Sequence, residues 1–466
     1  MRIFKSPFAL IILYLLVGLF TIVFFNGTGG SGDSIYHYLY AKYAFSYPEL
    51  FFDHWAKPLY VLIFSPFAQF GFIGVKLLNL LFASGTLYLT AIISRKWFKT
   101  PFYVVQLLLI FAPLYYVLTF SGLTEPFFAF LLILGMYLYL SKKYYLGLII
   151  FSFLPFVRSE GLLFIGFIAF YELFSKNWKV LIYLFIGTFI YSIAGLSVHN
   201  DLFWVFTKIP YASTSSVYGE GDFFHFFEQL LYVVGIPFYI LMWIGLIVMT
   251  VTVFKRKTSF KLYYLFVLGA GVFIVAHSLF WFLGIFNSMG LNRVLICILP
   301  LLSIIAAQGW FFLYKYLKKI NAVYGYLFYA IAVSSIILFP FSGNKAALNL
   351  EHDLSLKLEQ KIALEVKDFL IQEDIHFEKL YAGHPYVNKI LEVNPFSGSE
   401  FEFLSFKSPE HMGENDLIIW DNWFSIIEQN IPLKFLESKS SLGKIFWKEQ
   451  VNYKGRNVQY AVFRKL

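Results

Sequence analysis

GGSGDSIYHYLYAKYAFSYPELFFDHWAKPLY, residues Gly29 to Tyr60, is a polar stretch in an otherwise apolar chain. It follows the first long apolar run directly. Its charged residues and histidines, interleaved with tyrosines, are Asp33, His37, Lys42, Glu49, Asp53, His54 and Lys57. A bilayer excludes unpaired charge, so this density of ionisable groups requires water or chemistry to justify it. We interpret the stretch as the active-site loop of a membrane enzyme, with an ordinary solvated loop as the alternative.

The composition places most of the chain in lipid. Of 466 residues, 59% are hydrophobic and 14% are charged, whereas soluble domains carry about 25% charged residues. The net charge of +9 comes from the part before Phe341, which holds 22 Lys and Arg against 10 Asp and Glu. Basic residues gathered in short loops are topology signals rather than a nucleic-acid surface. No nucleic-acid partner is therefore expected, and the single cysteine, Cys297, allows no disulfide.

The apolar runs predict about eleven transmembrane helices. Pro7 to Phe25 is too long for a cleaved signal peptide and is expected to stay as the first helix. The other runs fall near 72–94, 101–119, 123–140, 144–157, 161–175, 180–198, 231–254, 262–282, 294–314 and 322–341.

Charge sets the predicted orientation of these helices in a plasma (inner) membrane. Basic clusters occupy alternate gaps, which makes that side, and the N-terminus, cytoplasmic: Arg2/Lys5, Arg95/Lys96/Lys99, Lys142/Lys143, Lys176/Lys179, Lys255/Arg256/Lys257/Lys261 and Lys315/Lys318/Lys319. Nine of the ten carboxylates before Phe341 then lie on the outer face, with Glu172 as the exception. Any chemistry is expected to face outward.

Residues 342–466 are predicted to form a second, soluble α/β domain on the outer, periplasmic side. Strand patterns at 416–420 and 460–463 follow an amphipathic helix through 354–371. The fold class is thus an α-helical polytopic membrane protein, residues 1–341 with a first outer loop at about 26–71, plus a C-terminal α/β domain. The loop between His199 and Gln229 is either a lid over a lipid substrate or a plain connector.

Asp33 is the predicted catalytic residue. Glycines before it permit close approach of the backbone to a ligand, and His37 follows one helical turn later. A carboxylate in such a cleft is a usual catalytic base, whereas a solvated aspartate in a flexible turn is the alternative.

The second cluster of the loop contains Asp53, His54 and Lys57. Lys57 could pair with a phosphate or serve as an interfacial anchor. Asp53 and His54 could orient an acceptor or bind a divalent metal, but two adjacent residues do not make a coordination sphere. No metal site or cofactor is firmly implied.

Four further polar residues lie at helix ends on the predicted outer side. Arg158 and Glu160 either line a water-filled cavity or pair with each other. Glu125, in Thr124-Glu125-Pro126, fits helix-start chemistry with Thr124 as the cap. Arg293 runs against the positive-inside trend, which an anionic partner such as a lipid phosphate would explain; snorkelling to the surface is the alternative.

A carboxylate beside outward cations suits group transfer from a lipid phosphate. Asp33 would deprotonate an acceptor hydroxyl, while Lys57, Arg158 and Arg293 would stabilise the departing phosphate. His37, Asp53, His54, Glu125 and Glu160 would line the site or contact the acceptor.

The motifs GDSIYHYLYAK, HWAKPLY, SGLTEPFFAFLL, FVRSEGLLF and NRVLICILPLL, in this order, resemble the GT-C superfamily of polytopic glycosyltransferases. The resemblance covers residues 1 to about 341 and is to the protein O-mannosyltransferase, aminoarabinose transferase and bacterial mannosyltransferase-like branch. It implies inverting transfer of a mannose-like hexose or related sugar from a polyprenyl-phosphate donor to a protein or glycolipid acceptor on the outer face. It also implies that Asp33 is the catalytic carboxylate and matches Lys57-Pro58 and Arg158 to family positions.

The sequence departs from this family at Ser34, where many relatives carry a second acidic residue. No Asp-x-Asp occurs in the loop, so metal dependence is in doubt. Two alternatives of other classes are a membrane transporter or flippase of lipid-linked or small polar substrates, and a non-catalytic scaffold with the same fold. A transporter usually shows inverted repeats, and the sequence shows none.

Overall fold

The computed structural model describes residues 6–30, 32–210 and 219–466. The predicted basic pair Arg2/Lys5 and residues 211–218 of the predicted lid lie outside this part. Helices fill the chain up to Phe341: α1 (Phe8–Phe24), α2 (Gly32–Tyr43), α3 (Pro58–Ala68), α4 (Gly71–Trp97), α5 (Phe102–Ile110), α6 (Pro113–Thr119), α7 (Glu125–Leu140), α8 (Tyr144–Ser152), α9 (Gly161–Phe174), α10 (Ile186–Ala194), α11 (Leu196–His199), α12 (Trp204–Thr207), α13 (His225–Val234), α14 (Ile236–Phe254), α15 (Phe260–Tyr263), α16 (Gly269–Phe282), α17 (Leu299–Ile320) and α18 (Ala322–Leu338).

Several apolar runs are interrupted rather than continuous. Five stretches of the described chain are long and apolar enough to cross a membrane: Gly71–Trp97, Ile236–Phe254, Phe260–Phe282, Asn292–Ile320 and Ala322–Phe341. The pair α5 and α6 would be a sixth, but it bends by 73° where Pro113, which has no N–H to donate, starts α6. The remaining predicted spans are shorter apolar helices, so the number eleven stays a prediction.

Short non-α helical segments account for several of these interruptions. Two of them, η4 (Trp178–Phe185) and η6 (Asn292–Ile298), are 3₁₀ segments that lead into α10 and α17. A π segment, η5 (Tyr264–Leu268), joins α15 to α16. The other short segments are η2 (Pro48–Phe52), η3 (Leu154–Phe156) and η7 (Phe339–Phe341).

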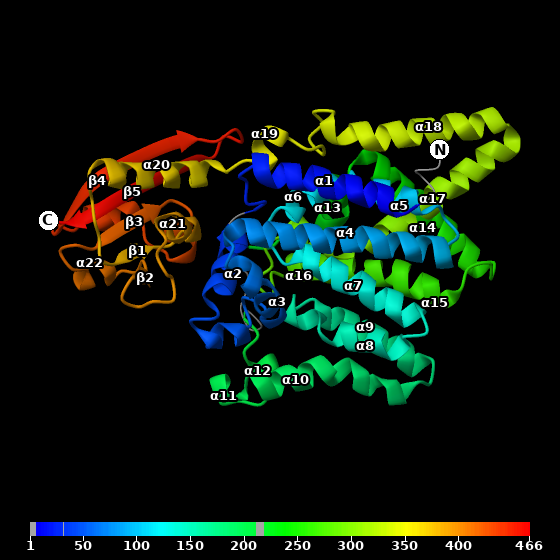
Figure 1. Cartoon of the computed structure of the whole chain (residues 1–466), viewed down its shortest axis with the longest axis horizontal. Helices are drawn as coiled ribbons and strands as arrows, with labels where there is room; N and C mark the ends of the chain where they lie inside the picture. Colours follow the sequence, from blue (N-terminus) through cyan, green and yellow to red (C-terminus); the bar gives the residue numbers. More distant parts are fainter. Residues whose placement is uncertain (1–5, 31, 211–218) are drawn as a thin grey trace.

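The predicted first outer loop is largely helical. Asp33 lies in the first turn of α2, where a carboxylate complements the helix dipole, rather than in a flexible turn. The 11-residue α3 follows and leads into α4 after only two residues. Figure 1 shows α2 and α3 at the end of the helical bundle that faces the C-terminal sheet.

The C-terminal residues form a five-stranded sheet at one end of the helical bundle (Figure 1). Its order is β2-β1-β3-β5-β4, with β1 parallel to β2 and β3, and β5 antiparallel to β3 and β4. The strands are β1 (Leu380–Ala382), β2 (Phe401–Phe403), β3 (Leu417–Asp421), β4 (Leu442–Val451) and β5 (Asn457–Lys465). The helices are α19 (Leu350–Asp353), α20 (Leu358–Gln372), α21 (Pro385–Leu391), α22 (Ser408–His411), the π segment η8 (Phe424–Glu428) and α23 (Leu433–Glu437).

The degree of burial and the length of each strand explain which strands could be predicted from the sequence. Every residue of the central strand β3 is buried, and the apolar run that predicted it is continuous. The edge strand β4 is mostly exposed or half-buried and carries Lys444, Lys448 and Glu449 among its apolar residues, so no continuous apolar run marks it. Strands β1 and β2 have three residues each, too few for a pattern to show.

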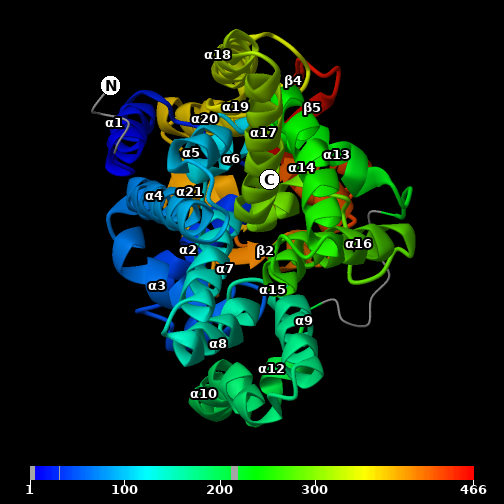
Figure 2. The ribbon, with the colours of Figure 1, turned by 90° about the vertical axis from the view of Figure 1, so that its right-hand side faces the viewer.

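The bundle carries a side lobe when it is viewed along the helices. Figure 2 shows α8, α9, α10 and α12 grouped at one side, while α18 lies at the other. The helix α17 runs through the middle, with its first half buried. The loops after α4 and α7, which carry basic residues, lie at the end of the bundle far from the sheet (Figure 1).

The turn before α7 is fixed against α2 by a chain of hydrogen bonds. Gly122 N–H donates to Ser34 Oγ over 2.7 Å, and its carbonyl accepts from the Tyr60 hydroxyl over 2.7 Å. A Cβ on Gly122 would lie 2.2 Å from the Ser34 carbonyl oxygen. Backbone cannot move aside as a side chain can, so this contact sets where α2 lies.

We expect Gly122→Ala to lower the free energy of unfolding by about 1–3 kcal/mol, the usual effect of overpacking a tight contact. Thermal unfolding of the detergent-solubilised protein measures it. Gly166→Ala is the matched control, because a Cβ there meets no atom within 4 Å. Equal unfolding temperatures for the two variants would contradict the close approach.

Candidate active site

Asp33 and Arg293 form an ion pair that joins the start of α2 to η6 across 260 residues of sequence. Arg293 also reaches a second carboxylate: its Nε lies 3.3 Å from Glu125 Oε1. Glu125 is fully buried, whereas 36% of the Asp33 side chain is exposed. The arginine that runs against the positive-inside trend is thus explained inside the protein by two carboxylates.

Glu125 joins Arg293 to a second arginine. Arg158 Nη1 lies 2.9 Å from Glu125 Oε1, and its Nη2 lies 2.8 Å from Glu160 Oε1. The predicted Arg158–Glu160 pair is therefore present, but as one part of a longer network. His277 extends it, with Nε2 3.7 Å from Glu160 Oε1.

The interpretation of Thr124 as a helix cap is wrong. Thr124 has αR backbone angles and makes no side-chain cap hydrogen bond to α7. Its Oγ1 instead accepts from Arg158 Nη1 over 3.0 Å, so the hydroxyl orients the arginine. Glu125 likewise serves the two arginines rather than the helix terminus alone.

Lys57 is the third cation, and it differs from the two arginines. Its Nζ donates to Ser159 Oγ over 2.9 Å, and among the described residues no carboxylate lies within 4 Å of it. Burial lowers the pKa of Lys57 to about 8, against the opposing field of Glu160. Its backbone φ is +70°, a conformation that side-chain-bearing residues rarely adopt and that is common at functional sites.

Asp33 is ionised at neutral pH. Burial favours its protonated form, but the Arg293 guanidinium outweighs that effect and holds the pKa of Asp33 below its usual value. The adjacent His37 is neutral, because burial lowers its pKa to about 3. Its ring stacks on Trp55, 5.0 Å between centroids, which fixes the loop that carries Lys57 to α2.

Asp53 and His54 shape the loop instead of facing the ion-pair network. Asp53 Oδ1 accepts from the Ala56 backbone N–H over 2.8 Å and closes the turn before Lys57. His54 Nε2 bonds the Val205 carbonyl over 3.0 Å, toward the side lobe. The described residues contain no group of three or more His, Cys, Asp or Glu that could hold a metal ion.

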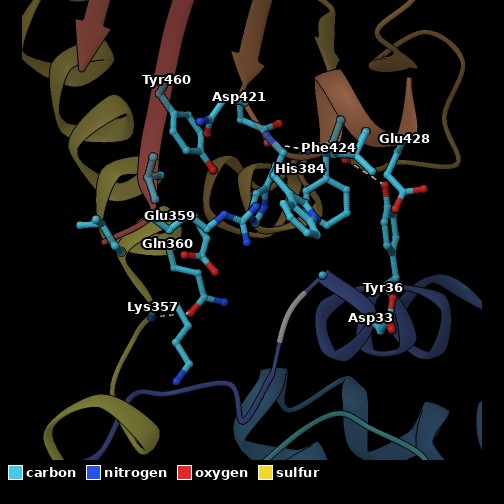
Figure 3. A pocket seen from close by; sticks show the side chains of 18 of the residues that line it. Asp33, Tyr36, Lys357, Glu359, Gln360, His384, Asp421, Phe424, Glu428 and Tyr460 are labelled. Atoms are coloured by element: carbon cyan, nitrogen blue, oxygen red, sulfur yellow. Dashed lines mark hydrogen bonds between the residues drawn. The ribbon is translucent and has the colours of Figure 1, made fainter. Parts of the chain in front are cut away.

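A cleft of about 1340 Å³ opens on the other side of Asp33, between α2 and the C-terminal residues. Figure 3 shows Asp33 and Tyr36 on one wall and His384, Asp421 and Tyr460 on the opposite wall. Arg158 and Glu160 do not line this cleft among the described residues, so the predicted cavity at their junction is not the one found. Of the network, Asp33 alone is part of its lining.

The opposite wall was not predicted from the sequence. Asp421 ends β3 and accepts hydrogen bonds from the backbone of Trp423 and Phe424, yet burial still raises its pKa to about 6. His384 caps α21 through Tyr386 N–H, as expected of a structural turn, and it also lines the cleft. His384 follows the three-residue strand β1 and Asp421 is the last residue of β3, and no motif in their local sequence indicates a cleft.

The C-terminal residues contact the helical part directly at Asp33. A Cβ on Gly32 would lie 2.3 Å from Phe424 Cζ and 3.0 Å from Pro385 Cγ, so the glycine permits contact with the sheet side, not with a ligand. The hydrogen bonds that tie the two parts together include Gly27 N to Leu354 O, Gln360 Nε2 to Thr28 Oγ1, Tyr36 OH to Gly383 O and Asn394 Nδ2 to Tyr47 OH.

We expect Gly32→Val to separate the two walls of the cleft, because the larger side chain needs the space of the Phe424 ring. Limited proteolysis checks this, with faster cleavage between Phe341 and Leu358 as the expected result. Gly398→Val is the control, since a Cβ there meets nothing within 4 Å. Unchanged cleavage in Gly32→Val would show that the contact does not hold the walls together.

These features define the class of protein. The long apolar helices make the chain an integral membrane protein, and its architecture is the GT-C fold. It is similar over its whole length to solved structures of ArnT from Cupriavidus metallidurans. The structure bound to undecaprenyl phosphate matches with a TM-score of 0.53 and 11% identity, covering 98% of both chains. The apo structure matches with a TM-score of 0.57 and 12% identity, covering 97% of both.

At these identities the likeness concerns the fold. No protein-family model matches the sequence, and no curated protein is significantly similar to it. The predicted GT-C architecture is confirmed, and the coverage shows that the C-terminal sheet belongs to the shared chain length.

Proposed function

We propose that the protein is an inverting glycosyltransferase that moves a sugar, a hexose or a related one, from a polyprenyl-phosphate donor to an acceptor hydroxyl. The observation that carries the proposal is the position of Asp33. Three cations lie behind it on the side of the helical bundle, and an open cleft lies in front of it. A solved structure of the same fold holds undecaprenyl phosphate, which supports a donor of that class.

In the proposed reaction the acceptor hydroxyl gives its proton to the Asp33 carboxylate. The acceptor oxygen bonds to the anomeric carbon, and the bond from that carbon to the phosphate oxygen breaks. The electron pair leaves on the polyprenyl phosphate. Preorganised cations at the departing phosphate stabilise the charge that develops there.

Lys57 is the cation best placed to receive the phosphate. Arg158 and Arg293 already share Asp33, Glu125 and Glu160, so these five groups carry a net charge of −1 and Lys57 brings the network to zero. In the described part of the chain, the Lys57 ammonium has a neutral hydroxyl as its hydrogen-bond partner. A phosphate would give it the charged partner that it lacks.

We further propose that residues 342–466 form an extracytoplasmic domain that faces the acceptor, and that the N-terminus is cytoplasmic. The basic loops after α4 and α7 lie at the bundle end far from the sheet, which supports this orientation. Labelling of single introduced cysteines with a membrane-impermeant thiol reagent tests it. A cysteine at Lys454 should react in intact cells and one at Lys142 should not.

Phosphate binding by Lys57 should depend on pH. The ammonium carries its charge below a pKa of about 8 and loses it above, so affinity for undecaprenyl phosphate should fall between pH 7 and pH 9. Lys57→Arg keeps its charge over this range and should bind with little change. Binding titrations in nanodiscs at several pH values measure both, and equal pH dependence of the two proteins would exclude Lys57 as the phosphate ligand.

The function itself is tested by comparing glycans on envelope proteins and lipids, by mass spectrometry, in cells with and without the gene. Loss of one sugar addition is the expected result, and the mass difference identifies the sugar class. Unchanged glycans, together with altered movement of a lipid-linked substrate across the membrane, would favour the transporter alternative.

A further inference from the structure

The cleft in front of Asp33 has an aromatic wall that starts at the catalytic carboxylate. Asp33, Tyr36 and Tyr40 are spaced by three and four residues on α2, so they lie on one face of the helix, and all three line the cleft. Trp55 packs edge-on against Tyr36, with 5.9 Å between ring centroids. Phe396 packs edge-on against Tyr40 at 4.8 Å.

Several of the aromatic rings in this wall keep part of their surface exposed. Tyr36, Trp55 and Phe396 are only half-buried, and Phe403, 6.4 Å from Tyr36, is 51% exposed. A wall of partly exposed aromatic rings in a concave site takes ligands that have both apolar faces and polar edges. A sugar ring has this character, because its C–H faces pack on aromatic rings while its hydroxyls point outward.

Two buried polar atoms on the opposite side of the cleft lack partners among the described residues. They are the Tyr460 hydroxyl and Gln429 Oε1, and both side chains line the cleft. Figure 3 shows the Tyr460 hydroxyl directed into the space between the walls. A buried polar atom without a hydrogen bond is costly, and a small rotation of the Tyr460 or Gln429 side chain would bring it within reach of the hydroxyls of a ligand in the cleft.

The charge of the cleft favours a neutral ligand. Its lining carries four carboxylates, Asp33, Glu359, Asp421 and Glu428, and four cations, Lys357, Lys361, Lys454 and Arg456. Lys57, Arg158 and Arg293 are not among the described lining residues. The cations that would hold a phosphate therefore lie behind Asp33, and the cleft itself has no surplus of either charge.

We propose that this cleft is the acceptor site and that it takes a neutral glycan, whose sugar rings stack along Tyr36 and Tyr40 and present a hydroxyl to Asp33. This inference rests on the proposed function, because Asp33 is the base in both. It narrows the acceptor from any hydroxyl to one carried by an uncharged carbohydrate, and it assigns substrate binding to Tyr36, Tyr460 and the C-terminal wall.

Binding without donor tests the cleft separately from transfer. The probes are uncharged manno- and chito-oligosaccharides of five units, an O-phosphorylated mannose oligosaccharide, and a neutral serine-rich peptide of similar size. Saturation-transfer NMR or calorimetry on the full-length protein in nanodiscs measures affinity. We expect at least one neutral oligosaccharide to bind, and to bind at least tenfold more tightly than the phosphorylated one or the peptide.

Substitutions of cleft residues test whether the oligosaccharide binds in the cleft. Tyr36→Ala should weaken it at least tenfold, whereas Tyr36→Phe keeps the ring and should change it less than threefold. Tyr460→Phe removes one hydroxyl and should weaken it about fivefold. Tyr145→Ala, an exposed tyrosine outside the cleft, is the control. Each variant is used only if its unfolding temperature stays near that of the wild type.

The outcomes separate the two proposals. Tighter binding of the peptide or the phosphorylated glycan, or oligosaccharide binding that ignores Tyr36 and Tyr460, overturns the neutral-glycan cleft even if sugar transfer is established. Oligosaccharide binding that needs Tyr36, in a protein whose deletion changes no envelope glycan, leaves the cleft standing and removes the transferase. Failure of every neutral oligosaccharide to bind overturns the inference.

Discussion

Asp33→Asn is expected to lower sugar transfer by about 10³-fold, within the range that a positioned general base contributes. The amide keeps the size of the side chain and can still bond Arg293, but it cannot take a proton from the acceptor. The reason for expecting so large an effect is geometric. Asp33 is the one group of the ion-pair network that also lines the cleft.

The measurement is transfer in proteoliposomes, with the donor class that the envelope comparison identifies. Asp201→Asn is the matched control, since Asp201 is a carboxylate of the predicted outer face whose side chain, among the described residues, bonds its own loop at Phe203 N–H and Thr207. Asp33→Asn should bind undecaprenyl phosphate as well as the wild type does. Activity above about one tenth of wild type would assign the base to another residue.

The sequence identified most residues of the ion-pair network but, apart from the Arg158–Glu160 pair, not its connections. Arg158, Glu160 and Arg293 were predicted from charges in an otherwise apolar chain, Asp33 from the glycines and His37 near it, and Glu125 from helix-start chemistry. Their partners lie up to 260 residues away, and local pattern carries no information on such distances. For this reason Thr124 was assigned to its own helix, although its hydroxyl faces Arg158.

In the fold as well, the sequence predicted features that depend on a local pattern and missed the others. Hydropathy located the apolar runs but not their breaks, because an average over a run of apolar residues does not register the bend at Pro113 or the 3₁₀ segment before α17. In the C-terminal part the buried strand β3 was recognised, whereas β1 and β2 are too short to show a period. On the far wall of the cleft, His384 follows the short strand β1, whereas Asp421 and Tyr460 lie in β3 and β5, and a strand pattern does not show which of its residues face a cleft.

Glu125→Gln is expected to lower the free energy of unfolding by about 3 kcal/mol, the cost of breaking a buried ion pair by removing one partner. Glu125 has no solvent exposure and its Oε1 lies within 3.3 Å of nitrogens from both Arg158 and Arg293. Without that charge two guanidinium groups repel each other in a site of low dielectric. Reversible unfolding in mixed micelles, followed by circular dichroism, measures the change.

Glu160→Gln is the matched control for Glu125→Gln. Glu160 also pairs with Arg158, at 2.8 Å, but 16% of its side chain is exposed and it reaches no second arginine among the described residues. Solvent can replace part of what the carboxylate supplied, so its loss should cost less than the loss of Glu125, about 2 kcal/mol, which is typical of a hydrogen bond to a charged group. Equal destabilisation by the two substitutions would mean that Glu125 does not organise the arginines. A larger effect for Glu125→Gln, together with weaker binding of undecaprenyl phosphate, would show that one buried carboxylate positions both cations behind Asp33.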